Sequence, residues 1–349
     1  MDRLNYLARR LLLAIPTFLG ITLVCFALTR ILPGGPVEMR LQRLRGGNAG
    51  GESGGGAAVA RVAAVTEDQR RELNRQFGFD QPFLIQYGRW LVRDRMGLRM
   101  YSYDYNNKTA WDLIRTRIPV SLWFGVAGFL LSYLVCIPLG IAKALRHGSS
   151  FDMASSVVVF AGYAVPAFAL GMILKTLFCG TVEELLDIFP LGGFESANAA
   201  SWSWGARLVD RAWHMALPVA CYVAGNFAVL TLLMKNSLLE QVGSDYVRAV
   251  LAKGASARRA VWGHAVRNAL IPIATGFGSI LGIFFAGSVI IEYIFEIPGM
   301  GRLSLQALMG RDYAVFMAML ALTSTLQLIG NLLSDFSYML IDPRIHFGK

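Results

Sequence analysis

Six stretches of the chain contain no Asp, Glu, Lys or Arg and are long enough to cross a lipid bilayer as helices. A helix needs about 20 apolar residues to cross roughly 30 Å of hydrocarbon, whereas strands are much shorter. We therefore predict an all-α integral membrane protein with six transmembrane helices. The predicted spans are 11–29, 120–142, 153–174, 212–234, 268–291 and 313–340, the last of them free of charge as far as Ser334.

The first stretch has an alternative interpretation as a signal peptide, because Arg9 and Arg10 precede it. Its apolar part is long for a signal peptide, and residues 30–36 form a poor small-x-small cleavage site. We expect this helix to remain as a membrane anchor.

Lys and Arg are distributed unevenly among the short connections, and this distribution predicts the orientation. Thirteen of them fall in four segments, which are 1–10, 143–152, 235–267 and 341–349. The opposite connections, 175–211 and 292–312, carry four arginines, besides Lys175 at a span end. We expect both termini in the cytoplasm. The external segment 30–119 is too long to count, because long loops cross the membrane largely regardless of charge.

Composition agrees with a membrane protein, because 55% of the residues are hydrophobic and 16% are charged, against about 25% charged in soluble proteins. This balance argues against a cytosolic enzyme. A soluble protein with a net charge of +10 would suggest nucleic acid as a partner. Here the basic residues fit the insertion bias and attraction to anionic lipid, and no nucleic-acid-binding motif is present. Membrane lipid is the expected partner.

Motifs for catalysis, metals or nucleotides are missing from the sequence. No glycine-rich loop ends in Gly-Lys-Ser or Gly-Lys-Thr, so the chain shows no ATP site of its own. The four cysteines have no CxxC spacing and the four histidines have no ligand spacing. We expect no cofactor, no metal and no enzyme activity in this chain.

The long external segment changes character along its length. Residues 46–56 contain seven glycines and predict a flexible loop. The later stretch 82–96 places Phe83, Tyr87 and Trp90 at helical spacing. These aromatic side chains either pack on the outer ends of the membrane helices, lie at the lipid interface, or contact a partner.

The longest cytoplasmic connection, 235–267, has the pattern of two short helices. Asp245 is a candidate cap for the first, Gly254 permits a sharp reversal, and Ser256 is a candidate cap for the second. Exposed apolar residues beside basic ones suit either a groove on a partner protein or the lipid surface.

The residues of this connection resemble the "EAA" loop of binding-protein-dependent ABC importer permeases, in the form of the dipeptide, oligopeptide and nickel branch. The resemblance is carried by 245–254 and 264–272, and by motifs along nearly the whole chain at 77–82, 137–142, 298–303 and 341–344. The glycine-rich insertion is most similar to the B-type permease of microcin C and oligopeptide importers. Two residues depart from the general loop, since Arg248 replaces its Glu and Val250 its second Ala.

The resemblance implies a type I ABC importer permease fold in the bacterial inner membrane and a role as one half of a translocation path. Implied partners are a second homologous permease, two ATPase domains on one or two chains that bind ATP and Mg, and an external solute-binding protein. The preferred substrate is a peptide, with nickel or another chelate as the alternative. The residues implied in ATPase coupling are Asp245, Tyr246, Val247, Val250, Leu251, Lys253, Gly254, Arg258 and Arg259.

Within that set, we expect the four apolar residues to supply apolar contact with the ATPase, and the basic ones to supply polar contacts at its rim. Four polar residues inside spans are candidates for the path, with hydrogen bonding between helices as the alternative; they are Asn226, Thr231, Thr275 and Gln327. An ion-gradient-driven transporter is the rival function. Acidic residues in the spans or an internal duplication would favour it, and the sequence shows neither convincingly.

Overall fold

A computed structural model describes residues 2–31, 71–72, 80–105, 107–181, 186–274 and 288–341. Within those ranges every regular element is helical, and extended pairing is limited to two isolated bridges, Tyr101 with Thr109 and Cys179 with Asp187. The all-helical class predicted from the sequence is confirmed for these residues. The predicted glycine-rich loop 46–56 lies outside them.

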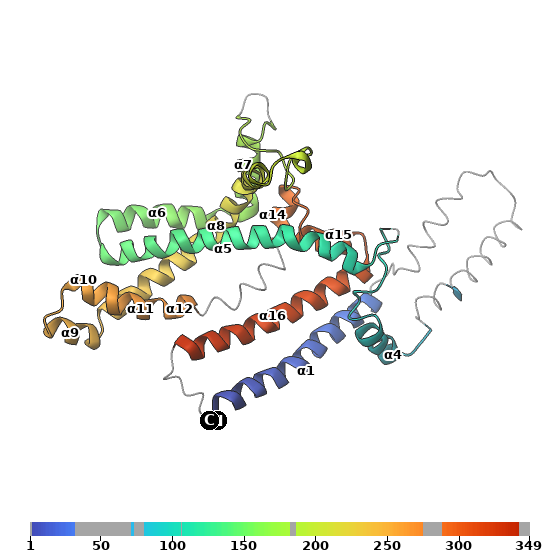
Figure 1. Cartoon of the computed structure of the whole chain (residues 1–349), viewed down its shortest axis with the longest axis horizontal. Coiled ribbons are helices and arrows are strands. Elements are labelled where there is room, and N and C mark those ends of the chain that lie inside the picture. Colours follow the sequence, from blue (N-terminus) through green and yellow to red (C-terminus); the bar gives the residue numbers. More distant parts are fainter. Residues whose placement is uncertain are drawn as a thin grey trace, which may run out of the picture. The chain divides into compact units, whose positions relative to one another are not determined.

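Three helices are long and apolar enough to cross a membrane by themselves (Figure 1). They are α1 (Asp2–Ile31), α5 (Ala110–Leu145) and α16 (Tyr313–Ile341). Two bent pairs pass the same test: α6 (Ser150–Ala164) with α7 (Ala167–Phe178), and the two halves of α8 (Trp204–Val242). The described residues thus contain up to five candidate spans. Residues 275–287 of the predicted fifth span lie outside them.

The predicted span 153–174 consists of two helices, because the chain turns by 93° between α6 and α7. Val165 is extended and Pro166 occupies the N-cap position of α7, as expected because proline lacks an amide hydrogen and disfavours a helical residue before it. The chain therefore bends sharply at Pro166. In α8 the 48° bend falls between Gly225 and Phe227 and not at Pro218.

The chain forms two compact units. Unit 1 comprises residues 1–12, 117–303 and 326–349, and unit 2 comprises 13–116 and 304–325. Besides the long helices, they contain the following shorter ones: α4 (Phe83–Gly88), η1 (Arg89–Arg93), η2 (Ala199–Ser201), α9 (Asp245–Ala252), α10 (Ala257–Ala260), η3 (Val261–Ala265), α11 (Val266–Ala269), α12 (Ile271–Ala274), α14 (Val289–Ile294) and α15 (Met300–Met309).

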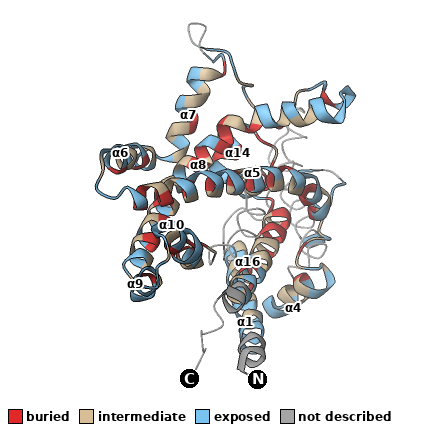
Figure 2. Ribbon diagram, turned by 60° about the vertical axis from the view of Figure 1, so that its left-hand side comes forward, coloured by how far each residue is buried: buried red, intermediate tan, exposed pale blue. Residues whose placement is uncertain are grey.

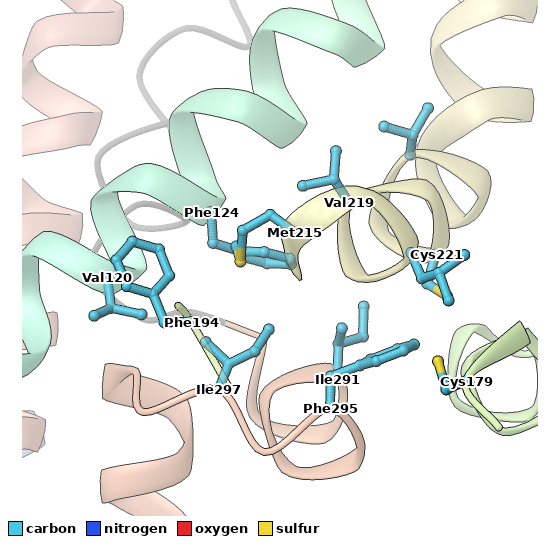
Figure 3. Close-up of a cluster of buried hydrophobic side chains, with 12 residues drawn as sticks. Val120, Phe124, Cys179, Phe194, Met215, Val219, Cys221, Ile291, Phe295 and Ile297 are labelled. Atoms are coloured by element: carbon cyan, nitrogen blue, oxygen red, sulfur yellow. The ribbon is translucent and has the colours of Figure 1, made fainter. Parts of the chain in front are cut away.

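Unit 1 has two apolar clusters. Figure 3 shows the first, in which Phe124 of α5, Cys221 of α8 and Phe295 after α14 pack with Cys179 at the end of α7. The second joins α5 and α8 to the short helices that follow α8. Away from these clusters α5 exposes large apolar side chains such as Leu130 and Leu134, as expected for a helix that faces lipid. Figure 2 shows that α5 carries exposed as well as buried positions along its length.

Unit 2 has its own core around Trp90, which is buried against Phe26 of α1 and Met317 and Ala321 of α16. The rings of Phe26 and Trp90 are 5.8 Å apart, and the Tyr87 hydroxyl lies 2.8 Å from the hydroxyl of Thr22. The predicted packing of the 82–96 aromatic residues on a membrane helix is therefore confirmed.

Candidate functional site

The segment after α8, residues 243–274, contains the predicted coupling residues. Its first helix, α9, starts at Asp245, and Ser244 occupies the cap position without a capping side-chain bond. The prediction of Asp245 as the cap is therefore wrong by one residue. As the first helical residue, Asp245 still places a negative charge at the positive end of the helix dipole.

The reversal at Gly254 is confirmed. Its φ is +86°, and nothing lies within 4 Å of the position that a Cβ would take. The amide of Gly254 donates to the carbonyl of Leu251 (2.9 Å), and that of Ala255 donates to Val250 (3.3 Å). This is the Schellman pattern, in which glycine adopts the left-handed conformation that terminates a helix.

The second helix starts where the sequence predicts. The Ser256 hydroxyl accepts a hydrogen bond from the amide of Arg259 (3.3 Å) and caps α10. The chain then continues through η3 and α11, with Ala260, Ala265 and Ala269 buried. These small residues allow the segment to approach α8 closely.

One face of the segment packs into the second apolar cluster of unit 1. Val247 is 2% exposed and belongs to the same cluster as Met234 and Leu238 of α8, with Val250 partly buried against it. The side chain of Val247 is enclosed by its own subunit, and its expected contact with an ATPase stays a prediction.

The opposite face is open. Tyr246 is 36% exposed, Leu251 43% and Trp262 54%. The predicted polar residues Lys253, Arg258 and Arg259 are exposed as well. The predicted apolar set therefore divides into an inward pair, Val247 and Val250, and an outward pair, Tyr246 and Leu251. The sequence places Trp262 on an apolar position but does not reveal that it faces outward.

The candidate path residues are not brought together among the residues that the structure describes. Thr231 is fully buried in α8, whereas Gln327 is exposed on α16 and donates to Asn331 one turn away (3.1 Å). Thr275 and the side chain of Asn226 lie outside the described part.

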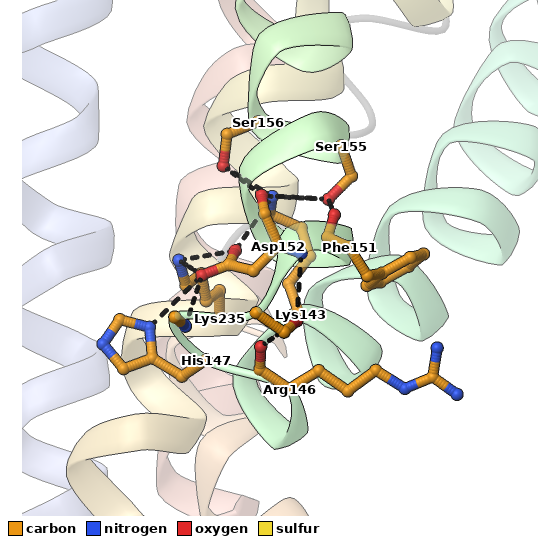
Figure 4. A network of polar contacts seen from close by, with 10 residues as sticks. Lys143, Arg146, His147, Phe151, Asp152, Ser155, Ser156 and Lys235 are labelled. Atoms are coloured by element: carbon orange, nitrogen blue, oxygen red, sulfur yellow. Dashed lines mark hydrogen bonds and ion pairs between the residues drawn. The ribbon is translucent and has the colours of Figure 1, made fainter.

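A polar cluster that the sequence analysis missed lies at the ends of α5, α6 and α8 (Figure 4). The Asp152 carboxylate is 3.1 Å from Lys143 Nζ, and both of its oxygens are 2.8 Å from Lys235 Nζ. The hydrogen bond from Lys235 holds the pKa of Asp152 well below its usual range. The available signal was one acidic and two basic residues at the ends of three predicted spans. Only the two lysines entered the sequence analysis, and only to predict orientation.

Two further carboxylates organise the predicted external connections of unit 1. Glu195 accepts hydrogen bonds from Arg207 (2.8 and 2.9 Å) and Arg211 (2.9 Å), and these, Arg207 first, lower its pKa to about 2. Glu292 is fully buried and accepts from the amide of Arg302 (2.8 Å) and from the Ser121 hydroxyl (3.3 Å). Burial raises the pKa of Glu292 to about 7.

The segment 298–303, recognised earlier as a motif, wraps around Glu292. The amide of Met300 donates to Ser121 (2.7 Å), and a Cβ on Gly299 would lie 2.5 Å from an oxygen of Glu292. In unit 2, Asp312 is buried and accepts hydrogen bonds from the Ser102 hydroxyl and from the amide of Tyr103 (3.1 Å). These hydrogen bonds therefore hold the loops around Glu292 and Asp312 in place.

The helical fold and the apolar outer faces are those of an integral membrane protein. Residues 136–347 match the family of the "Binding-protein-dependent transport system inner membrane component". That match covers more than half of the chain, so the chain belongs to this family. It is a multi-pass inner-membrane permease subunit and not an enzyme, since ATP hydrolysis resides in a separate subunit of such systems.

Individual relatives match over almost the whole length. The chain is 38% identical to the inner membrane ABC transporter permease protein YejB of Escherichia coli O157:H7, over 98% of both chains. It is 37% identical to the peptidoglycan transport system permease protein YejB of Agrobacterium fabrum, over 99% of this chain and 98% of that one. It is 32% identical to the dipeptide transport system permease protein DppB of Escherichia coli K12, over 99% of this chain and all of that one.

Proposed function

We propose that this chain is a peptide permease of an ATP-driven, binding-protein-dependent importer and forms half of its translocation path. The observation that carries this proposal is similarity over nearly the full length to permeases named for dipeptides, oligopeptides and peptidoglycan. The partners are a second permease, two ATPase domains on one or two chains that bind ATP and Mg, and an external binding protein.

In this proposal the chain crosses the inner membrane six times, with both termini in the cytoplasm. Two observations support the topology: the charge-free stretches of the sequence, and the Lys and Arg residues concentrated in 1–10, 143–152, 235–267 and 341–349. The three long helices and two bent pairs agree with five of these spans. The fifth predicted span supplies the remaining one.

The segment from Asp245 to Arg267 is the proposed docking element for the ATPase. Tyr246, Leu251 and Trp262 offer apolar surface, and Lys253, Arg258 and Arg259 provide the charged rim, in the manner of a helix that inserts into a groove. Val247 and Val250 secure the element to α8. ATP drives the cycle only because it binds one conformation of the assembly better than the other.

For the path itself, the proposed polar residues are Asn226, Thr231, Thr275 and Gln327. Gln327 supports this role most directly, because its side chain is exposed on α16. Thr231 is buried, so it faces the path only in a conformation in which α5 and α8 have moved apart.

Uptake by membrane vesicles tests this function. The chain is co-expressed with the proposed second permease and ATPase subunits, and uptake of labelled alanine di-, tri- and pentapeptides is measured in the presence of the binding protein. We expect uptake that requires ATP and survives collapse of the proton gradient. Uptake without ATP that stops on collapse would favour an ion-driven transporter, and uptake of chelated nickel with no peptide uptake would favour the alternative substrate.

A further inference from the structure

The Asp152 cluster connects three helices at one place (Figure 4). Asp152 lies in the first turn of α6, Lys143 near the end of α5, and Lys235 on α8. Besides the two lysines, the carboxylate contacts the amide of Gly148 (3.2 Å) and Nδ1 of His147 (3.3 Å). Two positive charges thus share one carboxylate.

Lys143 holds α5 and α6 together at this cluster. Its side chain is fully buried, and Nζ donates to the carbonyl of Asp152 (2.9 Å) and to the hydroxyls of Ser155 (2.8 Å) and Ser156 (2.7 Å). Separating α5 from α6 would leave a buried ammonium group without partners, which is strongly unfavourable. The two helices therefore move together here.

Few side chains of α6 are buried within this chain. Of its 15 residues, Asp152 and Val159 are the buried ones, while Val157, Val158 and Phe160 are exposed. Besides its close approach to α8, α6 is therefore held in position by its polar contacts. Lys235, only 12% exposed at its side chain, provides such a contact from α8.

The position of Lys235 relates this contact to the proposed docking element. Lys235 adjoins Met234, which belongs with Leu238 and Val247 to one apolar cluster, and α8 runs on to Val242 just before α9. A displacement of α9 therefore reaches α8 through this cluster, at the place where Lys235 holds Asp152.

We propose that Asp152 is the joint that passes movement of the docking element from α8 to the α5–α6 pair, and through the 93° bend to α7. Asp152 is then a positioning residue of the transport cycle. It does not contact substrate or ATP. This inference rests on the proposed function.

The test compares Asp152→Asn with wild type in the complete complex reconstituted in vesicles, with the alanine peptides above as probe. The variant keeps the shape of the side chain and leaves the three hydrogen bonds of Lys143 available. We expect the complex to assemble and to hydrolyse ATP at about the basal wild-type rate, while peptide transported per ATP falls about tenfold, within the usual range of coupling between sites. Asp152→Glu restores the charge and should recover part of the loss.

Glu195→Gln is the matched control, because it removes a carboxylate that also lies between two cations but touches neither α6 nor the docking element. Its transport per ATP should stay within about twofold of wild type, since the pair is partly solvent-exposed. If Asp152→Asn fails to accumulate in the membrane, transport per ATP is measured for Lys235→Gln instead. That variant removes the contact with α8 but preserves the contact between Asp152 and Lys143.

The proposal that Asp152 transmits movement between these helices is contradicted if Asp152→Asn or Lys235→Gln transports as much peptide per ATP as wild type. It is also overturned if the ATPases dissociate from either variant, which would indicate a structural role, or if Asp152→Glu loses as much coupling as the Asn variant. Failure of the proposed function is a separate result, because the wild-type complex itself would then show no ATP-dependent peptide uptake.

Discussion

The two ends of unit 1 hold their buried carboxylates in opposite ways. At the coupling end, defined by Asp152 and its lysines together with residues 243–274, the carboxylate lies between two cations and its pKa is lowered. At the external end, defined by 186–211 and 292–303, Glu292 receives backbone and hydroxyl hydrogen bonds, and its pKa rises to about 7. Among the described residues no Lys or Arg side chain forms an ion pair with Glu292. A carboxylate keeps its charge where a cation shares its burial and becomes titratable where none does.

The difference also separates two mechanical roles. Asp152 ties three helices together through charged contacts, and it is one of the two buried residues of α6. Glu292 instead closes a tight loop, since its oxygens lie at the start of α15 and beside Ser121 of α5. Favourable interaction with a helix N-terminus compensates part of the cost of burying it. We infer that the coupling end transmits movement, whereas the external end resists it.

Glu292→Gln should have the largest effect on the difference between the two ends, because it removes the pH dependence of stability that Glu292 produces. An acid whose pKa is raised by folding stabilises the protein fully below its unfolded pKa, near 4.5, and this stability is lost as pH rises through about 7. The loss is on the order of 3 kcal/mol. Unfolding of the detergent-solubilised complex from pH 4 to 8 measures it, and the Gln variant should show a flatter profile than wild type.

Glu195→Gln is the control for that profile. The pKa of Glu195 is lowered to about 2, so its stabilising effect is present above about 4.5 and disappears only as pH falls toward 2. The slope between pH 4.5 and 7 should therefore remain as in wild type. Identical slopes for wild type and Glu292→Gln would show that Glu292 stays ionised, as Asp152 does.

Gly299→Ala tests whether the external end is as rigid as its contacts indicate. The added Cβ would lie 2.5 Å from the buried carboxylate of Glu292, and such overpacking should lower the free energy of unfolding by about 2 kcal/mol. Gly205→Ala is the matched control, because nothing lies within 4 Å of its Cβ position. Equal thermal midpoints for the two variants would mean that the loop around Gly299 rearranges to accept the methyl group at little cost in stability.

The sequence alone predicted what depends on neighbouring residues in the chain. The apolar spans, the cap at Ser256 and the reversal at Gly254 are local in this sense, and the structure bears out the last two. Contacts between distant segments were missed. Asp152 meets Lys235, 83 residues away, and nothing in the pattern indicates which charges at span ends face each other. The inward direction of Val247 was missed for the same reason, since it depends on how α9 packs on α8.

Truncating one side chain on each face of α9 distinguishes the face that packs on α8 from the proposed docking face. Val247→Ala removes buried side-chain volume and should lower the free energy of unfolding by about 1.5 kcal/mol. Leu251→Ala should leave it within about 0.5 kcal/mol, because its side chain is exposed, yet weaken retention of the ATPases. Thermal unfolding and co-purification of each variant separate the two effects. If Leu251→Ala retained the ATPases fully, the outward face would not be the docking surface.

Gly254→Val should have only a local effect on stability and the most specific effect on coupling. A β-branched residue at φ +86° costs about 1 to 2 kcal/mol locally, and it shifts the end of α9 without disturbing the spans. Gly263→Val is the control, because Gly263 lies in η3 and also has open space at its Cβ position. Membrane accumulation should be normal for both variants, whereas peptide-stimulated ATP hydrolysis should fall only for Gly254→Val. Normal stimulation in that variant would mean that the reversal is not needed to hold α9 in place, and the coupling end would then tolerate deformation that the external end does not.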